Sequence, residues 1–558
     1  MEEVVEQHQH QKSAEFRLLL SAWAIMAIIL FAIGYQNRTS PGPYYDEAVF
    51  SSLAKDFVTG QVHGPHTPGC RTITIFGRPF PSYVQVHVGA FKDWLQLPAL
   101  AAFGHTLGVV RLSSLAWGLV ALLLFMVWVW QWLGLRAALV AGPLLGFDPA
   151  FFFTNLFDFG SAVPSYLCRF ATFLFVIRWW KTKSLPIALL AGFFAGAGFS
   201  NKMDFSVVVG GVGLAALVSY WRPLVQHIRE RPLAPILGGA GFLLGALSML
   251  VHVFRMVHQV ETHPVTDYSR QTSAKLNVLV SMLDGSHFYR MFEAGGLFEQ
   301  INYSIHPFWI PTGMIFLIAV SVLGWGLVRK GRRDQSLLTS SPTKERNGRE
   351  SLFVLLALSG TCLGFFLLPG AERIYHATLI YPFPQLALVI LVLRFWPAKS
   401  EAPIAIRAAL TVCFIVVLAG AVFSISKTER FLHATGGRGW WSGSLSSFIK
   451  EVQKRDDLAL ISLDWGFNEQ LLLFTDGPKT AEPFWLWWKG RPLPPQLPRA
   501  TNYIYLIHPP EYTMYHAPLK YFQDAMASGS GCDVTQYSDK DGRIAFFTLQ
   551  FRPGSGSH

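Results

Sequence analysis

Residues 41–57 have the sequence PGPYYDEAVFSSLAKDF, and they follow closely on the first apolar run of the chain. That run extends from about Leu18 to Ile33, which approaches the ~20 residues that a membrane-spanning helix needs. No small-residue cleavage motif follows it, so we expect an uncleaved signal anchor. The adjacent acids Asp46 and Glu47 therefore lie just beyond a predicted membrane span.

The composition extends this prediction to the rest of the chain. Of the 558 residues, 51% are hydrophobic and only 15% are charged, whereas a soluble protein carries about 25% charged residues. Repeated membrane spans explain this deficit. We attribute the net charge of +11 largely to Lys and Arg in cytoplasmic loops, and we expect no nucleic acid as a partner. The five cysteines form no CxxC pair, which argues against a zinc site.

Eleven apolar segments are predicted to be membrane spans. They fall near 17–34, 108–134, 137–156, 160–180, 185–200, 203–221, 233–257, 308–329, 351–369, 374–395 and 404–425. The segment 84–103 contains His87, Lys92 and Asp93 together with a proline. We therefore predict it as an interfacial amphipathic helix.

The basic residues test this topology, because Lys and Arg collect in loops on the cytoplasmic side of a membrane. They are concentrated in alternate loops, at Arg136 and within 178–183, 222–231, 329–349 and 394–407. Counting segment 84–103 as a span would invert every one of these loops. The pattern therefore predicts eleven spans, with the N-terminus in the cytoplasm and the C-terminus outside it.

Three bodies are then predicted outside the cytoplasm: the first outer loop 35–107, the stretch 258–307, and the region 426–558. The last of these alternates apolar strands with helical segments and is predicted as a small α/β domain. Its strands are expected at 457–465, 502–508 and 543–551, and its helices at 467–474 and 518–528. The predicted fold class is an all-α polytopic membrane domain, 1–425, followed by this α/β domain.

Asp46 and Glu47 are the first candidates for chemistry. A carboxylate beside a nucleophile can take its proton or hold it in line. Transfer from a phosphate-linked donor also needs positive charge on the departing phosphate. Acids at the membrane surface, close to loops that contain Arg, Lys and His, meet both needs. The simpler interpretation is that two acids at a helix start interact favourably with the helix dipole.

Four stretches of sequence carry a resemblance to a known family. They are 44–57 (YYDEAVFSSLAKDF), 75–84 (IFGRPFPSYV) with 109–120 (VVRLSSLAWGLV), 155–164 (NLFDFGSAVP) and 373–389 (RIYHATLIYPFPQLALV). In this order, after one long N-terminal span, they resemble the GT-C superfamily of glycosyltransferases. The resemblance is closest to protein O-mannosyltransferases and bacterial lipid A aminoarabinose transferases, and it covers about residues 15 to 425.

This resemblance implies an inverting glycosyltransferase in a bacterial inner membrane. Such an enzyme moves a sugar from a polyprenyl-phosphate donor to a glycan, lipid or protein hydroxyl outside the cytoplasm. The resemblance implies that Asp46 is the base, with Glu47 in support, and that Asp158 is a second outer acid. It also places Arg78 where relatives have a lysine that contacts the carrier phosphate.

The sequence also departs from these relatives. It has no insertion that corresponds to the β-trefoil domain of the protein mannosyltransferases, and Gly77-Arg78-Pro79 replaces a Glu-Lys-Pro triplet. One acid is thus missing beside the predicted phosphate contact. For this reason the resemblance does not identify the donor sugar.

Four further basic residues are assigned to the substrate, three of them with a stated alternative. Arg373 and His376 either clamp the departing phosphate, for which the forked guanidinium is well suited, or anchor the chain at the membrane interface. Lys202 either contacts the substrate or forms a local ion pair with Asp204. Lys92 is also assigned to the substrate.

The two outer candidates most dependent on the resemblance also have simple alternatives. Asp158 lies between two apolar spans, where an ionisable group is costly and points to function, but a turn at the interface could hold it in water. Arg78 could simply extend its side chain to lipid headgroups. A divalent metal, Mg²⁺ or Mn²⁺, could be held between Asp46 and Asp158 through carboxylate oxygens.

Two other hypotheses concern the chain as a whole. Cys70 and Cys532 both fall outside the cytoplasm in this topology, where disulfides form, so their pairing would tie the C-terminal domain to the first outer loop.

The competing class of function is a transporter or flippase of lipid-linked glycan, which predicts paired repeats and broken spans; neither is evident in the sequence. A non-catalytic protein that binds lipid-linked glycan is a third class, and Asp46 argues against it.

Overall fold

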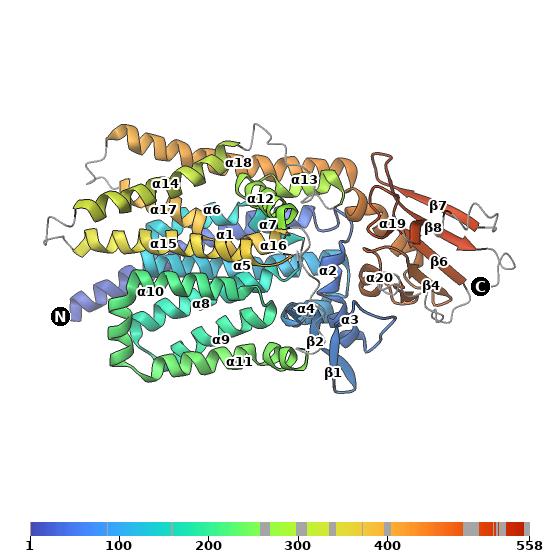
Figure 1. Cartoon of the computed structure of the whole chain (residues 1–558), viewed down its shortest axis with the longest axis horizontal. Helices are drawn as coiled ribbons and strands as arrows, with labels where there is room; N and C mark the ends of the chain where they lie inside the picture. Colours follow the sequence, from blue (N-terminus) through green and yellow to red (C-terminus); the bar gives the residue numbers. More distant parts are fainter. Residues whose placement is uncertain are drawn as a thin grey trace.

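The structure is a computed structural model that describes residues 2–85, 87–157, 160–256, 268–296, 310–333, 342–370, 372–395, 403–483, 502–516, 518–520, 523 and 532–551. Asp158, His258 and His263 lie outside the described residues, as does most of the predicted helix 518–528. The described chain forms a long helical bundle with a sheet-containing domain at one end (Figure 1). The N-terminus lies at the opposite end of the bundle.

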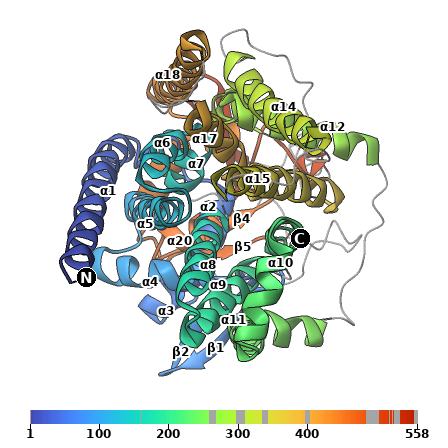
Figure 2. The same cartoon turned by 90° about the vertical axis from the view of Figure 1, so that its left-hand side faces the viewer.

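Helices occupy all eleven positions at which the sequence predicts a span. They are α1 (Glu2–Gln36), α5 (Leu107–Leu133), α6 (Leu135–Gly146) with α7 (Pro149–Leu156), α8 (Ala162–Thr182), α9 (Leu185–Asn201), α10 (Phe205–Glu230), α11 (Leu233–Met256), α14 (Ile310–Arg333), α15 (Pro342–Leu367), α16 (Ile374–Ala377) with α17 (Phe383–Phe395), and α18 (Ile404–Thr435). Figure 2 looks along this bundle and shows α17 between α6 and α15. In keeping with that place, α17 is buried along almost all of its length.

Seven of the helices in the described residues are long and apolar enough to cross a membrane, or eight if α6 and α7 form one bent span. The helices α8, α9 and α14 lie at predicted positions without meeting that standard, so the number eleven stays a prediction. The helix α18 continues to Thr435, past the predicted boundary of the membrane domain at residue 425, and that boundary stays a prediction.

The bend of 62° between α6 and α7 has a local cause. Pro149 begins α7, where its missing N–H costs nothing, and Asp148 caps the new helix by accepting hydrogen bonds from the amides of Ala150 (2.9 Å) and Phe151 (3.2 Å). The same carboxylate accepts hydrogen bonds from Tyr381 Oη (2.9 Å) and Gln385 Nε2 (3.0 Å). This buried polar group therefore ties the bend to α17.

A buried arginine holds the next irregular segment. Arg169 of α8 donates hydrogen bonds to the carbonyl oxygens of Thr378 (2.8 Å) and Tyr381 (2.7 Å), which flank the short helix η2 (Thr378–Ile380). A guanidinium inside an apolar bundle is costly unless it is paired. Here it donates to carbonyl oxygens at a break between helices, and it fixes the place of α16.

The first outer loop is a mixture of helices and strands. Its elements are α2 (Tyr45–Val49), α3 (Ser52–Thr59), β1 (Arg71–Ile75), β2 (Arg78–Gln85), β3 (Val88–Gly89) and α4 (Phe91–Phe103). The strands form an antiparallel sheet in the order β1-β2-β3. The predicted helix at 84–103 is therefore wrong in its first part and starts only at Phe91. Pro79, Pro81 and Gly89 disfavour a helix before that point.

Two short helices follow α11, namely α12 (Tyr268–Asp284) and α13 (His287–Ala294). The C-terminal domain then contains η3 (Gly439–Trp441), α19 (Gly443–Val452), β4 (Leu458–Ser462), α20 (Asn468–Phe474), β5 (Lys479–Ala481), β6 (Asn502–Ile507), β7 (Cys532–Ser538) and β8 (Ile544–Phe551). Its sheet has the order β5-β4-β6-β8-β7. Strand β4 is parallel to β5 and β6, and β8 is antiparallel to β6 and β7.

The three strands and the first helix predicted for this domain are present. Strands β5 and β7 were not predicted, because β5 is short and the side chains of β7 are mostly exposed and polar. The hypothesis of a disulfide between Cys70 and Cys532 is wrong, since both thiols are free. Cys70 donates to the carbonyl oxygen of Val84 (2.9 Å) in the first outer loop, whereas Cys532 begins the edge strand β7.

Candidate active site

Three ionisable side chains from two distant segments meet at the end of the bundle that carries the C-terminal domain. Lys202 and Asp204 lie in the turn between α9 and α10, and His376 lies in α16. Asp204 Oδ2 is 3.2 Å from Lys202 Nζ and 2.8 Å from His376 Nδ1. The Lys202 ammonium lies 3.4 Å from His376 Nδ1 and 3.8 Å from the centre of the Tyr375 ring. The structure thus confirms the ion pair between Lys202 and Asp204 and adds His376 to it.

This cluster is largely enclosed, with Lys202 only 5% exposed and Asp204 9% exposed. Burial by itself would raise the pKa of Asp204, but the charge of Lys202 and the hydrogen bond to His376 outweigh it and hold that pKa below its usual range. The carboxylate is therefore ionised at neutral pH. An ammonium that is paired with one carboxylate can still donate hydrogen bonds to a second anion.

Asp46 lies close to this cluster. It is half-buried in the first turn of α2. Burial lowers the pKa of Lys202, and the charges of Asp204 and then of Asp46 oppose that effect. The Asp46 carboxylate therefore lies within electrostatic range of the Lys202 ammonium. The sequence predicted both residues as part of the site, and the structure brings them together.

Glu47 has a different environment from its neighbour. It is fully buried and forms a two-pronged ion pair with Arg111 of α5, with 2.6 Å between Nε and Oε1 and 2.9 Å between Nη2 and Oε2. Arg111 also donates to the carbonyl oxygens of Pro41 (2.7 Å) and Gly42 (3.0 Å). This geometry suits the predicted supporting role, because Glu47 anchors the loop that presents Asp46. Arg111 was missed, although an arginine inside an apolar span is a recognisable signal.

The first outer loop also docks on the turn that carries Lys202. Val88 of β3 forms a β-bridge with Lys202, and the amide of Met203 donates to the carbonyl oxygen of His87 (3.1 Å). Only glycine fits at position 89, because a Cβ there would lie 2.3 Å from the Ser200 carbonyl oxygen. Backbone contacts therefore hold the loop and the turn in register.

Gly160 and Ser161, which follow Asp158 in the sequence, border the same site. A Cβ on Gly160 would lie 3.4 Å from Phe50 and 3.6 Å from Tyr375, and Asn201 donates to the carbonyl oxygen of Ser161 (2.9 Å). Phe50 ends the segment that begins at Asp46, while Tyr375 covers Lys202. The role predicted for Asp158 stays a prediction, since that residue is outside the described part of the chain.

Lys92 is buried, and its ammonium lies 5.2 Å from the centre of the Phe50 ring. Its neighbour Asp93 accepts a hydrogen bond from the amide of Ala54 (3.0 Å). Lys92 thus lies behind Phe50, on the α4 side of the site. The predicted contact of Lys92 with the substrate stays a prediction.

Two predicted phosphate contacts are placed elsewhere. Arg78 is exposed on the hairpin of β1 and β2, which projects from the end of the bundle (Figure 1), and it donates to the carbonyl oxygen of Val58 (2.6 Å) at the end of α3. Arg373 precedes α16 and acts on His287 of α13: burial, followed by the charge of Arg373, lowers the pKa of His287 to about 3. Arg373 is therefore near the cluster in sequence and within electrostatic range of α13.

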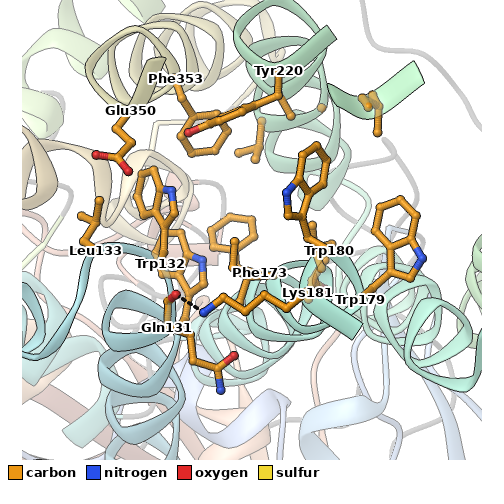
Figure 3. Close-up of a pocket in the computed structure, with 18 of the residues that line it drawn as sticks. Gln131, Trp132, Leu133, Phe173, Trp179, Trp180, Lys181, Tyr220, Glu350 and Phe353 are labelled. Carbon is orange, nitrogen blue, oxygen red and sulfur yellow. Dashed lines mark hydrogen bonds between the residues drawn. The ribbon is translucent and has the colours of Figure 1, made fainter. Parts of the chain in front are cut away.

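A partly open cavity of about 1060 Å³ is lined mainly by α5, α8, α10 and α15. It extends along α10 from Phe205, the residue after Asp204, to Leu224. Figure 3 shows its distal part, where Trp132, Trp180, Phe173 and Phe353 surround the space and Lys181 donates to the Gln131 carbonyl oxygen. The walls are mostly aromatic and aliphatic, so the cavity suits a hydrocarbon chain.

No group of three or more His, Cys, Asp or Glu side chains in the described residues could hold a metal ion. The hypothesis of Mg²⁺ or Mn²⁺ between Asp46 and Asp158 involves a residue outside that part of the chain, and it stays a hypothesis. What the described site holds is an acid, Asp46, beside a buried cation, Lys202.

The fold is similar to that of a solved membrane glycosyltransferase. Over 97% of this chain and 99% of the other, it matches ArnT from Cupriavidus metallidurans bound to undecaprenyl phosphate, with a TM-score of 0.54 and 12% sequence identity. An oligosaccharyltransferase from Archaeoglobus fulgidus matches over 84% of this chain and 65% of its own, with a TM-score of 0.46 and 12% identity. The predicted fold class is confirmed.

Within that fold, residues 89–252 match the family model of dolichyl-phosphate-mannose-protein mannosyltransferases. The resemblance predicted from the sequence is thereby confirmed. The match includes α5 to α11 and the turn with Lys202 and Asp204. No curated protein matches the sequence.

Proposed function

We propose that this chain is an inverting glycosyltransferase that moves a sugar from a polyprenyl-phosphate donor to the hydroxyl of a glycan, lipid or protein outside the cytoplasm. The observation that carries the proposal is the position of Asp46 beside the buried Lys202 cluster in a GT-C fold. The family match over 89–252 supports sugar transfer over the alternative of a transporter or flippase.

In this mechanism Asp46 is the general base. The acceptor hydroxyl attacks C1 of the sugar, the C1–O bond to phosphate breaks, and the hydroxyl proton passes to the Asp46 carboxylate. Lys202 stabilises the negative charge that develops on the departing phosphate. Asp204 and His376 hold the ammonium in place. Attack from the face opposite the phosphate inverts the configuration at C1.

The donor has a lipid part, for which the cavity offers space. ArnT was solved with undecaprenyl phosphate, and the matching family is named for a dolichyl-phosphate sugar, so polyprenyl phosphates are the supported class of carrier. The apolar cavity begins at Phe205, next to Asp204. A phosphate at Lys202 would thus leave its hydrocarbon chain at the mouth of that cavity.

The proposal places the enzyme in the inner membrane of a bacterium, with the N-terminus in the cytoplasm and the C-terminal domain outside. Basic loops at one end of the bundle support this orientation. Arg78, Lys92 and Arg373 stay proposed substrate contacts. Of these, Arg373 lies next to α16 and Lys92 lies behind Phe50.

The test compares cells that lack the gene with cells that express the native protein, Asp46→Asn or Glu47→Gln. Mass spectrometry of glycans and lipids should show a lost modification and accumulated donor in the absence of the gene. Asp46→Asn should fold but lower transfer by about 10²–10⁴-fold. The control is Asp457→Asn, an exposed acid paired with Arg455 in the C-terminal domain, which should transfer normally.

Glu47→Gln should chiefly lower the amount of folded protein, because it leaves the fully buried Arg111 without its partner charge. If Asp46→Asn transfers sugar at nearly the native rate while an Asp158 variant does not, the base is Asp158. If both variants transfer normally, the mechanism is wrong.

A further inference from the structure

A buried network of charges joins the first outer loop to the C-terminal domain. His66 of the loop lies between Asp56 of α3, with 2.6 Å from Nε2 to Oδ2, and Glu469 of α20, with 3.2 Å from Nδ1 to Oε2. All three side chains are at least nine-tenths buried. Burial opposes the charge on His66, but Glu469 and Asp56 outweigh that effect and raise its pKa to about 10. The network is therefore a buried cation between two carboxylates.

Glu469 has further partners in the loop. Its Oε1 accepts hydrogen bonds from the amide (2.6 Å) and the hydroxyl (2.9 Å) of Thr67, and its Oε2 accepts one from Ser52 Oγ (2.8 Å). Lys55 of α3 reaches the same helix and donates to the carbonyl oxygens of Leu472 (2.8 Å) and Thr475 (2.5 Å) at its C-terminal end. Such a set of partners resists displacement, because each broken contact leaves a buried polar group unsatisfied.

The network ends at the residue before Asp46. The Tyr45 hydroxyl lies 2.7 Å from Thr67 Oγ1 and 3.5 Å from Glu482 Oε2, and the Tyr45 ring packs against Trp465 at a centroid distance of 4.7 Å. Glu482 and Trp465 belong to the C-terminal domain. One neighbour of Asp46 is thus held by that domain.

The residue after Asp46 is held by the membrane bundle, through the ion pair of Glu47 with Arg111. The two anchors lie on either side of Asp46 in one short helix. A helix of five residues has too little hydrogen bonding to be stable by itself. Its orientation is consequently decided by what its two ends contact.

We infer that the C-terminal domain positions the catalytic base: Glu469, acting through Thr67 and Tyr45, holds α2 so that Asp46 faces Lys202. This inference rests on the proposed function. Tyr45 and Glu469 are positioning residues, which do not touch the substrate. Because a displacement of about 1 Å at a reacting group can cost about 10²-fold in rate, loosening this contact should lower turnover while donor binding at Lys202 remains.

The test uses the full-length protein with Tyr45→Phe, which removes only the hydroxyl and keeps the ring on Trp465. The matched control is Tyr537→Phe, since the Tyr537 hydroxyl donates to Glu451 (3.0 Å) within the C-terminal domain. Steady-state transfer from a polyprenyl-phosphate sugar should show kcat lowered about 10–100-fold in Tyr45→Phe, with KM for the donor unchanged and Tyr537→Phe like the native enzyme. Glu469→Gln should show the same change in kcat, more strongly.

A second measurement does not require activity. Hydrogen exchange of the α2 amides should become at least tenfold faster in Tyr45→Phe than in the native protein and in Tyr537→Phe. Unchanged exchange overturns the inference, whether or not the protein transfers sugar. If Asp46→Asn abolishes transfer while Tyr45→Phe keeps the native kcat, the inference fails alone. If Asp46→Asn transfers normally, the proposed function fails instead.

Discussion

At the scale of single residues, Lys202 shows how one buried charge can serve both stability and chemistry. Its ammonium is 3.2 Å from Asp204 and lies over the Tyr375 ring. Replacing it leaves Asp204 buried without a partner charge, and this change typically destabilises a protein by about 3–5 kcal/mol. It also removes the cation proposed to stabilise the leaving phosphate.

We therefore expect Lys202→Met to lower both the melting temperature and the rate of transfer, the rate by about 10²–10³-fold. The double variant Lys202→Met/Asp204→Asn should recover most of the melting temperature, because no unpaired charge stays buried, but none of the rate. Thermal unfolding in detergent and single-turnover transfer measure the two effects. Recovery of transfer in the double variant would contradict the role of Lys202.

The separate residues of this site could be predicted to different degrees. Asp46, Lys202 and His376 were predicted because each is an ionisable group at the end of an apolar segment. Their meeting could not be derived, since 156 residues separate Asp46 from Lys202 and it is packing of whole helices that joins them. Arg78 was predicted from a motif alone, and the hairpin that carries it was not foreseen. That hairpin is the reason Arg78 contacts α3.

At the scale of elements, α10 offers a direct test of the cavity. Gly213 lines the cavity, and Gly210 lies on the same helix outside its lining. A Cβ at either position would meet nothing within 4 Å. Both changes to leucine should favour the helix equally, because glycine is about 1 kcal/mol poorer than alanine in a helix.

Gly213→Leu should raise KM for a long-chain polyprenyl donor about tenfold, since displacing two methylenes from an apolar site costs about 1.6 kcal/mol. Gly210→Leu should leave that KM unchanged, and a short-chain donor should distinguish neither variant from the native enzyme. Steady-state kinetics with donors of two chain lengths provides the measurement. An equal effect of both variants would show that the lipid lies elsewhere.

The contact between α3 and α20 should depend on pH. The pKa of His66 is about 10 in the folded protein and about 6.5 in an unfolded chain. A raised pKa means that the stabilisation is fully present below about pH 6.5 and is lost as pH rises through about 10. The protection of α20 amides from hydrogen exchange should therefore fall between pH 7 and 10, beyond the intrinsic change in exchange rate.

The variant His66→Gln should abolish this dependence, because glutamine does not titrate. It should also lower the protection of α20 at pH 7, where His66 is charged and lies between Asp56 and Glu469. A pH profile of His66→Gln that parallels the native one would mean that another group controls the contact.

The elements themselves were predicted unevenly for physical reasons. Apolar length and loop charge identify the helices of the bundle, because a bilayer imposes both. Strand β1 was missed since its side chains are largely exposed, and strand β2 was missed since its buried residues do not alternate regularly. Exposed strands carry no burial pattern in the sequence, and only their pairing defines them.

At the scale of the whole molecule, the orientation in the membrane is the main open prediction. A reporter that is active only outside the cytoplasm should be active when fused after Thr435, at the end of α18. The same reporter inserted between α14 and α15, near Ser340, should be inactive. The opposite pattern would contradict the topology and place Asp46 on the cytoplasmic side, where the proposed acceptor is absent.

The length of α18 has a consequence for what can reach the site. At 1.5 Å per residue, its 32 residues extend about 48 Å, whereas the hydrocarbon core of a bilayer is about 30 Å thick. As much as about 18 Å of continuous helix thus extends beyond the hydrocarbon core, and it holds the C-terminal domain above the lipid surface. The distance between the lipid surface and this domain limits the size of an acceptor that approaches from the side. One extra helical turn in α18 would move the C-terminal domain about 5.4 Å farther from the lipid surface. This change would separate α20 from α2, and it would also widen the space through which the acceptor enters.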